Sequence, residues 1–323
     1  MFTDLPEAEL RAYTATVADP DGFDEFWAGE LERSRAAARP VELSEVDAGL
    51  TAIRVFDVTF SGWNGQPIKG WLRVPAHAEG PLPGVVEYVG YGGGRGHATA
   101  NLLWAAAGYA HLLMDTRGQG SGWSRGDTAD DAGSGGPQIP GVMTRGIRSP
   151  QTHYYARFFT DAVLAVDALR SLDLVDAGRV GVTGGSQGGG TALAVGALSD
   201  GVRAVAAQVP FLCEMPRGIT ITDAYPFKEV TDYLATHRDE VDTVLGTLAF
   251  FDGVNFARRG RVPALFSAAL MDPIVPPSTV FAAYNAYPAE KDLLLWRYSG
   301  HEGGGPDDLA AALAFFGKQL ASA

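Results

Sequence analysis

The sequence predicts an α/β protein with a mostly parallel central sheet flanked by helices, on the basis of three observations. From Pro83 onward, strand-like apolar runs alternate with helical patterns, which is typical of consecutive βα units. Each apolar run is continuous, as expected for a strand that is buried on both faces. Hydrophobic residues make up 46% of the 323 residues, enough to bury the core of such a sheet. We therefore expect one domain over residues 1–323.

The part of the chain before the parallel sheet is expected to form a helical extension and a hairpin. The extension covers about residues 1–50, in which residues 5–40 have a charged, helical pattern. Two β-like runs follow at residues 51–60 and 67–74, and the Asn-Gly pair at 64–65 favours a tight turn between them. The sequence thus predicts an antiparallel hairpin at the entry to the sheet.

The alternating pattern then continues to the end of the chain. The expected strands lie at residues 83–89, 109–115, 179–184, 202–209, 262–270 and 292–298. The expected helices lie at residues 97–108, 157–172, 187–198, 277–287 and 307–320. Two stretches interrupt the alternation. Residues 120–146 are glycine-rich and too long for an ordinary connection, which indicates a functional loop, and residues 213–260 contain short helical patterns that predict a small inserted cap.

Charge and composition exclude several classes of protein. The net charge of −13 argues against a nucleic-acid partner, because phosphate-binding surfaces carry clustered Lys and Arg. The single cysteine, Cys213, cannot form an intrachain disulfide or a thiolate-rich metal site. No apolar run approaches the roughly 20 residues needed to span a membrane, and the first residues lack the pattern of a signal peptide. We expect a cytoplasmic protein with no membrane contact.

The stretch GVTGGSQGGG at residues 181–190 places one serine among six glycines. A phosphate-binding P-loop needs a lysine directly after its glycines, but the next lysine is Lys228. A dinucleotide fingerprint needs G-x-G-x-x-G, a spacing that neither this stretch nor residues 90–96 contain. The remaining match is G-x-S-x-G around Ser186, between a predicted strand and a predicted helix, which is typical of a nucleophile elbow. A glycine-rich helix start capped by a serine is the alternative.

A nucleophilic serine needs a base and an acid, which follow it along the chain in the α/β-hydrolase fold in the order acid, then histidine. Two histidines follow Ser186. His237 lies in an amphipathic pattern typical of a surface helix, whereas His301 directly follows the last predicted strand. Asp272 lies in the turn after the preceding strand. We therefore predict Ser186 as nucleophile, His301 as base and Asp272 as acid; a capping histidine and an ordinary Asp-Pro turn are the alternatives.

Ester hydrolysis also needs two backbone donors for the oxyanion, one from the residue after the nucleophile and one from the loop after an early strand. The first is predicted to be the amide of Gln187, and the second the amide of Tyr91 in the sequence VGYGGGRG. A flexible glycine turn without such a role is the alternative for this second segment.

Three motifs together resemble those of a known family: RGQG at residues 117–120, GGSQGGG at 184–190 and HEGGG at 301–305. They are similar to the signature motifs of carbohydrate esterase family 7, the acetyl xylan esterases and cephalosporin-C deacetylases of the α/β-hydrolase fold. The similarity spans nearly the whole chain beyond the N-terminal helices. The resemblance implies the same triad and oxyanion residues. It also places Arg117, Gln119 and Glu302 in the family's motifs, although Arg117 could simply pair with a neighbouring acid.

The resemblance implies further properties. It suggests a narrow acyl pocket bounded by Tyr91 and Pro226, and a homohexamer in which the early hairpin helps to form the interface. Val275 stands where the family is expected to show cysteine more often. The implied activity is that of a serine carboxylesterase, without metal or organic cofactor, acting on small acetyl esters such as acetylated xylo-oligosaccharides and cephalosporin C. A general short-chain esterase or peptidase of the same fold, and a non-catalytic binding protein, are the alternatives.

Overall fold

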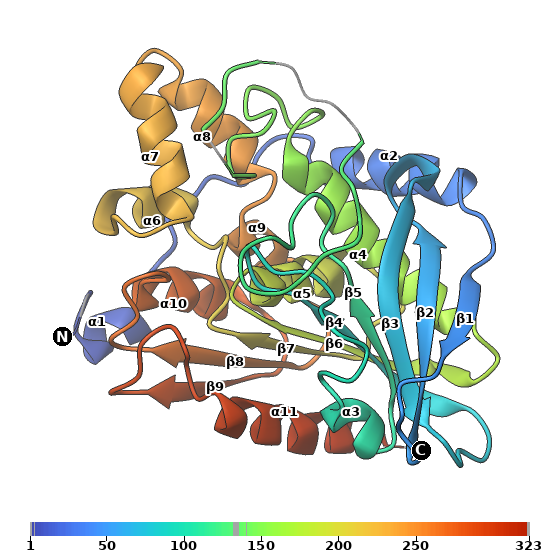
Figure 1. The fold of residues 1–323 in the computed structure, drawn as a ribbon. Helices are drawn as coiled ribbons and strands as arrows, with labels where there is room; N and C mark the ends of the chain where they lie inside the picture. Colours follow the sequence, from blue (N-terminus) through green and yellow to red (C-terminus); the bar gives the residue numbers. More distant parts are fainter. Residues whose placement is uncertain (1, 3, 132–135, 140, 322–323) are drawn as a thin grey trace.

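A nine-stranded sheet forms the centre of the molecule and is covered by helices on both faces (Figure 1). This computed structural model describes residue 2 and residues 4–131, 136–139 and 141–321. Residues 132–135 and 140 of the predicted functional loop, and residues 1, 3, 322 and 323, lie outside the described part. In chain order the strands are β1 (Glu42–Val46), β2 (Ile53–Ser61), β3 (Pro67–Pro75), β4 (Leu82–Tyr88), β5 (Ala110–Met114), β6 (Val175–Gly185), β7 (Ala204–Gln208), β8 (Ala264–Ala269) and β9 (Lys291–Trp296).

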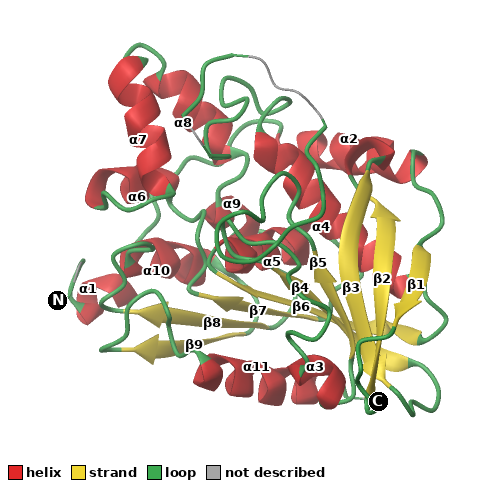
Figure 2. Cartoon of the chain, viewed as in Figure 1, coloured by secondary structure: helices red, strands yellow, loops and turns green. Residues whose placement is uncertain are grey.

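The strand order in the sheet is β1-β2-β3-β5-β4-β6-β7-β8-β9. The first three strands and β5 pair antiparallel, and every pairing from β5 to β9 is parallel. Figure 2 shows the antiparallel strands on one side of the sheet and the parallel strands fanning out from them. The predicted hairpin and the mostly parallel sheet are confirmed. The strand β1 was not predicted, because its five residues are almost all exposed and have no apolar pattern.

The helices follow the βα alternation that the sequence predicts. They are α1 (Glu7–Arg11), α2 (Phe23–Ala36), α3 (Leu103–Ala106), α4 (Tyr154–Arg170), α5 (Gln187–Leu198), α6 (Met215–Ile221), α7 (Phe227–Thr236), α8 (Val241–Ala249), α9 (Gly253–Ala257), α10 (Pro277–Ala286) and α11 (Pro306–Gln319). Helices α3 and α11 cover one face of the sheet, and α4, α5 and α10 cover the other (Figure 1). Within the described ranges, every helix is too short or too polar to span a lipid bilayer.

Two predicted helical regions are only partly helical. The helix expected at residues 97–108 is reduced to α3, because the buried guanidinium of Arg73 takes the carbonyls of His97 and Ala98 as hydrogen-bond acceptors (3.2 and 3.1 Å). Asn101 also adopts a left-handed backbone conformation with φ of 52°. In the N-terminal extension the chain is irregular between α1 and α2, where the Glu214 carboxylate accepts the backbone amide of Thr16 (2.6 Å).

The β7–β8 segment (residues 209–263) contains α6, α7, α8 and α9, in the region where the sequence predicts a small cap. Figure 1 shows α7 and α8 standing away from the sheet, whereas α9 lies close to α5. The segment therefore reaches over the edge of the sheet at which the parallel strands end. Cys213, at its start, is fully buried, as expected for a small apolar side chain.

Candidate active site

Ser186 lies in the sharp turn between β6 and α5. Its φ of 56° and ψ of −119° place a non-glycine residue in a strained backbone conformation, which is characteristic of a nucleophile elbow. The flanking glycines permit this turn. A Cβ atom on Gly188 would lie 2.1 Å from the carbonyl oxygen of Tyr88, and one on Gly184 would lie 2.5 Å from the backbone of Gly188. Close backbone approach thus explains two of the glycines around the serine.

The structure brings Ser186, His301 and Asp272 into one hydrogen-bonded chain. The Ser186 Oγ lies 3.0 Å from His301 Nε2, and His301 Nδ1 lies 2.8 Å from Asp272 Oδ2. Because a carboxylate can only accept, His301 carries its proton on Nδ1, which leaves Nε2 free to accept a proton from the serine. The three residues come from the carboxyl ends of β6, β8 and β9, where the parallel strands direct their loops to a common edge.

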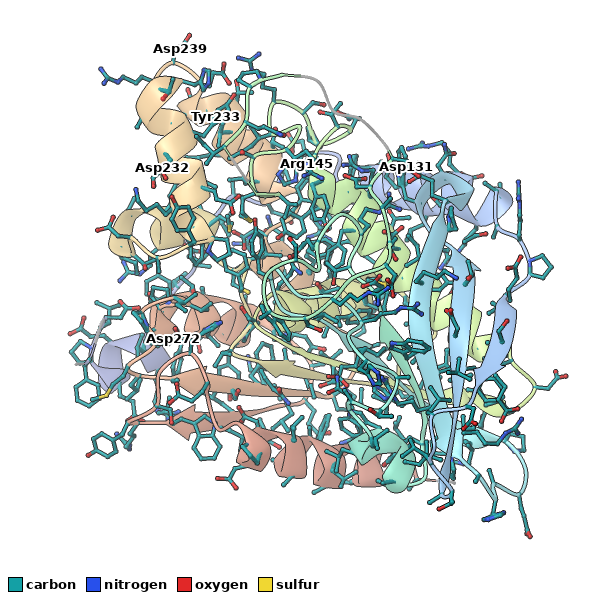
Figure 3. The ribbon with its side chains drawn as sticks, in the orientation of Figure 1. Asp131, Arg145, Asp232, Tyr233, Asp239 and Asp272 are labelled. Carbon is teal, nitrogen blue, oxygen red and sulfur yellow. The ribbon has the colours of Figure 1, made fainter. Side chains whose placement is uncertain are left out.

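The Asp272 carboxylate is fully buried in the loop between β8 and α10 (Figure 3). Its Oδ1 accepts the backbone amides of Ile274 and Val275 at 2.8 and 2.9 Å. These two bonds hold the side chain so that Oδ2 faces His301. Val275, the position that departs from the expected family pattern, contributes only a buried side chain and this backbone amide.

Two carboxylates shape the loop that carries His301. Glu302 accepts the backbone amide of Gly300 at 2.9 Å, and backbone hydrogen bonds lower the pKa of its carboxyl group. Asp308, in the first turn of α11, accepts the amide of Gly304 at 2.9 Å and the hydroxyl of Ser267 at 3.0 Å. Glu302 thus supports the loop, and among the described residues its carboxylate forms no hydrogen bond to the triad. Sequence reasoning missed Asp308, whose only signal was its place at a helix start.

The side chain of Gln119 connects the two segments that are predicted to form the oxyanion hole. Its Oε1 accepts the amide of Gly92 at 2.7 Å, and its Nε2 donates to Gln187 Oε1 at 3.0 Å. Gln187 in turn donates to the carbonyl of Val89 at 3.2 Å. The loop that contains Tyr91 is therefore tied to the first residue of α5 through side chains.

The hydroxyl of Tyr154 links Gln119 to Arg117, since it accepts Gln119 Nε2 at 3.0 Å and donates to the Arg117 carbonyl at 2.6 Å. The Arg117 side chain is fully buried. Its guanidinium donates to both carboxylate oxygens of Asp161 on α4, at 2.5 and 2.8 Å. It also donates to Gln66 Oε1 at 2.6 Å and lies 3.3 Å from Asp130. Asp161 accepts the amide of Trp63 in the β2–β3 turn as well. The alternative in which Arg117 pairs with a neighbouring acid matches these contacts, which join the hairpin to α4.

Replacing Arg117 with methionine is expected to reduce the free energy of unfolding by about 3–5 kcal/mol, because the buried Asp161 carboxylate would lose its charged partner. Urea unfolding followed by circular dichroism measures this change. Arg125→Met is the matched control, since that side chain is 81% exposed and pairs with Asp127 at the surface. Equal stability of the two variants would contradict the structural role of Arg117.

A cavity of about 700 Å³ opens directly over the triad. Ser186, His301, Tyr91 and Pro226 all line it, so the two residues predicted to bound the acyl group lie beside the predicted nucleophile. Trp123, which is 67% exposed, and Tyr225, which is 55% exposed, also line the cavity. Within residue 2 and residues 4–131, 136–139 and 141–321, no three His, Cys, Asp or Glu side chains form a group that could hold a metal ion.

Comparison with known proteins places this chain in a family. The family model for acetyl xylan esterase (AXE1) matches residues 1–319. The chain belongs to the acetyl xylan esterase family. An acetyl xylan esterase from Paenibacillus sp. R4 is 36% identical, with a TM-score of 0.92, and the match covers 98% of this chain and 100% of that one. Acetyl xylan esterase 1 from Thermoanaerobacterium sp. JW/SL YS485 is 33% identical, with a TM-score of 0.89, over 97% and 99% of the two chains.

Acetyl esterase Axe7A from Xylanibacter ruminicola is a more distant relative, which is 27% identical over 296 residues, or 90% of this chain. The chain spans 65% of the length of that relative. Together with the two solved structures, this similarity confirms the acetyl xylan esterase family and the α/β-hydrolase fold that the three sequence motifs predicted.

Proposed function

We propose that the protein is a serine carboxylesterase that removes acetyl groups from small esters, such as acetylated xylo-oligosaccharides and cephalosporin C. The observation that carries this proposal is the hydrogen-bonded chain from Ser186 through His301 to the buried Asp272, at the base of an open cavity. Its family and its similarity to solved acetyl xylan esterases support the acetyl group as the acyl part.

In the proposed mechanism, the Ser186 hydroxyl attacks the acetyl carbonyl while His301 Nε2 accepts its proton. Asp272 stabilises the imidazolium that forms. The backbone amides of Tyr91 and Gln187 are proposed to hold the oxyanion. The alcohol then leaves with the proton from His301. Water, deprotonated by the same histidine, attacks the acetyl-enzyme and releases acetate, which restores the free serine.

The residues that line the cavity support separate binding regions for the acyl part and the alcohol part of the substrate. Tyr91 and Pro226 are proposed to limit the acyl side to acetyl and little more. The exposed aromatic side chains of Trp123 and Tyr225 offer apolar faces on which the ring of an acetylated sugar could stack. A cavity of about 700 Å³ holds much more than an acetyl group, which leaves room for the alcohol part of the substrate.

A substrate panel tests this proposal against the general esterase and the peptidase. We expect kcat/KM for an acetyl ester to exceed that for the matching butyryl ester by at least about 100-fold, because overfilling a packed acyl pocket costs a few kcal/mol. Aminoacyl amides are expected to show no turnover. Butyryl esters hydrolysed as fast as acetyl esters would favour the general esterase, and cleavage of aminoacyl amides would favour the peptidase.

The family resemblance also carries two proposals on the assembly and location of the protein. One is a homohexamer, for which the exposed strand β1 beside the β2–β3 hairpin offers an edge for contact. The mass in solution, measured by light scattering, tests it. The other is a cytoplasmic location.

A further inference from the structure

We propose that Glu229 is a positioning residue for the oxyanion hole, which holds Tyr91 in place only while its carboxylate is ionised. This inference rests on the proposed function, in which the Tyr91 amide stabilises the oxyanion. It assigns a catalytic purpose to the β7–β8 segment, because Glu229 lies on α7, outside the three signature motifs.

The Glu229 carboxylate joins three segments of the chain. Its side chain is buried, and its Oε1 accepts the phenolic hydroxyl of Tyr91 at 2.5 Å. Its Oε2 accepts the backbone amide of Met143, in the long loop before α4, at 3.1 Å. The Tyr91 oxygen also accepts the amide of Val142 at 2.8 Å. Gly141 packs directly on this carboxylate, since a Cβ atom there would lie 2.1 Å from Glu229 Oε1.

Tyr91 is anchored at three places, and Glu229 supplies one of them. The Tyr91 carbonyl accepts the indole N–H of Trp123 at 2.9 Å. The following amide, that of Gly92, donates to Gln119 at 2.7 Å. The phenol is the third anchor, and its ionic partner makes it a charge-assisted bond, which is stronger than a neutral one. Loss of the bond to Glu229 would leave the phenol held by the weaker neutral bond from the Val142 amide, which would allow the Tyr91 peptide to shift relative to Ser186.

Protonation of Glu229 conflicts with these bonds. Both of its oxygens already face donors, the Tyr91 hydroxyl and the Met143 amide. A proton on Oε2 would oppose the Met143 amide. A proton on Oε1 would require the Tyr91 hydroxyl to turn its own hydrogen away. The neutral acid therefore cannot keep both bonds as they stand, whereas the carboxylate can.

The environment of the Glu229 carboxyl group places its protonation near neutral pH. Burial raises the pKa of the Glu229 carboxyl to about 7, and this exceeds the opposing effects of the bonds from Tyr91 and Met143 and of the nearby Arg145 charge. The phenols of Tyr155 and Tyr225 also face it and are neutral in this range, since burial raises the pKa of Tyr155 well above its usual value and a bond to Asp232 raises that of Tyr225. Because the raised pKa is that of an acid, the carboxylate and its bonds predominate above about pH 7 and are lost below it.

The test is the pH profile of kcat and KM for an acetyl ester, from about pH 5.5 to about pH 9, in wild type and Glu229→Gln. We expect the variant to lose about tenfold in kcat above pH 8, a fraction of the effect of removing one oxyanion donor, with little change in KM. In wild type we expect an additional loss of up to about tenfold in kcat as the pH falls below about 7, where Glu229 takes up a proton, and we expect the variant to lack this additional step. Asp239→Asn is the matched control, since this exposed residue lies at the tip of the same segment (Figure 3).

A second variant keeps the inference testable if Glu229→Gln folds poorly. Tyr91→Phe removes the phenolic oxygen but leaves Glu229 in place, and it should show a similar loss in kcat. The double variant should lose no more than either single one, because both break the same contact. A wild-type pH profile in Glu229→Gln, additive losses in the double variant, or lowered thermal stability alone would each overturn the inference.

Labelling of the active-site serine by a fluorophosphonate separates this inference from the proposed function. Its rate depends on the triad and the oxyanion hole but not on recognition of acetyl esters. If wild type labels but hydrolyses no acetyl ester beyond the Ser186→Ala background, the proposed function fails. The Glu229 inference still stands in that case if Glu229→Gln slows labelling and removes the additional loss of rate below about pH 7, and it falls if labelling is unchanged.

Discussion

Replacing Ser186 with alanine is expected to lower kcat for acetyl ester hydrolysis by at least about 10⁴-fold, the largest effect of any single substitution proposed for this protein. The alanine cannot form the acetyl-enzyme, so only water attack assisted by the remaining site is left. Fold stability should change little, because within the described residues the Ser186 hydroxyl bonds only to His301, and the alanine would occupy the same backbone turn.

Steady-state hydrolysis of an acetylated sugar and of cephalosporin C measures this effect, with circular dichroism to verify folding. Ser149→Ala is the matched control, since the hydroxyl of this half-buried serine bonds to the nearby side chain of Gln151 and lies outside the active site. Hydrolysis at the wild-type rate in Ser186→Ala would refute the assignment of the nucleophile. Loss of activity in the control as well would point to a general effect on folding.

Replacing Asp272 with asparagine is expected to reduce kcat by about 10⁴-fold with an intact fold. The asparagine Oδ1 can still accept the amides of Ile274 and Val275, which preserves the loop. Its NH₂ group would then face His301 Nδ1, from which the carboxylate now accepts a hydrogen bond. This favours the tautomer with the proton on Nε2, which cannot accept the proton of Ser186.

The kcat of Asp272→Asn and of Asp292→Asn, compared on one acetyl ester, tests this role. Asp292 lies on β9 with its side chain exposed, so its substitution should leave kcat unchanged. A loss of less than about tenfold in Asp272→Asn would show that the buried carboxylate does not control the histidine tautomer. Chemical denaturation of both variants reveals whether a loss of activity comes from unfolding.

Patterns within short stretches of the chain predicted most of the fold. The helix at residues 187–198 has the same bounds as α5, and every predicted parallel strand is present. A short, continuous apolar run bounded by turn residues is typical of a buried strand, which explains why the strands could be predicted. The failures are places where distant residues compete for backbone groups. Arg73 donates to the carbonyls of His97 and Ala98, where α3 is shorter than predicted, and Glu214 binds Thr16 in an irregular segment.

The residues of the candidate triad could also be proposed from local patterns in the sequence. Ser186, Asp272 and His301 each directly follow a predicted strand, and the ends of parallel strands meet at one edge of a sheet. The residues that hold the loops of the candidate site in place had no such pattern in the sequence. Asp308 and Glu229 look like ordinary helix residues in the sequence, and only their partners at Gly304 and Tyr91 show what they hold.

Local patterns and motifs in the sequence were sufficient to predict the family and the parallel strands with their helices, and to propose Ser186, Asp272 and His301 as a triad. The partners of the buried charges could be identified only from the fold: Arg117 binds Asp161 across 44 residues, and Glu229 reaches Tyr91 across 138 residues. The physical reason is that a buried charge must find a partner wherever the fold brings one within hydrogen-bond distance, and that proximity depends on packing between elements far apart in the chain.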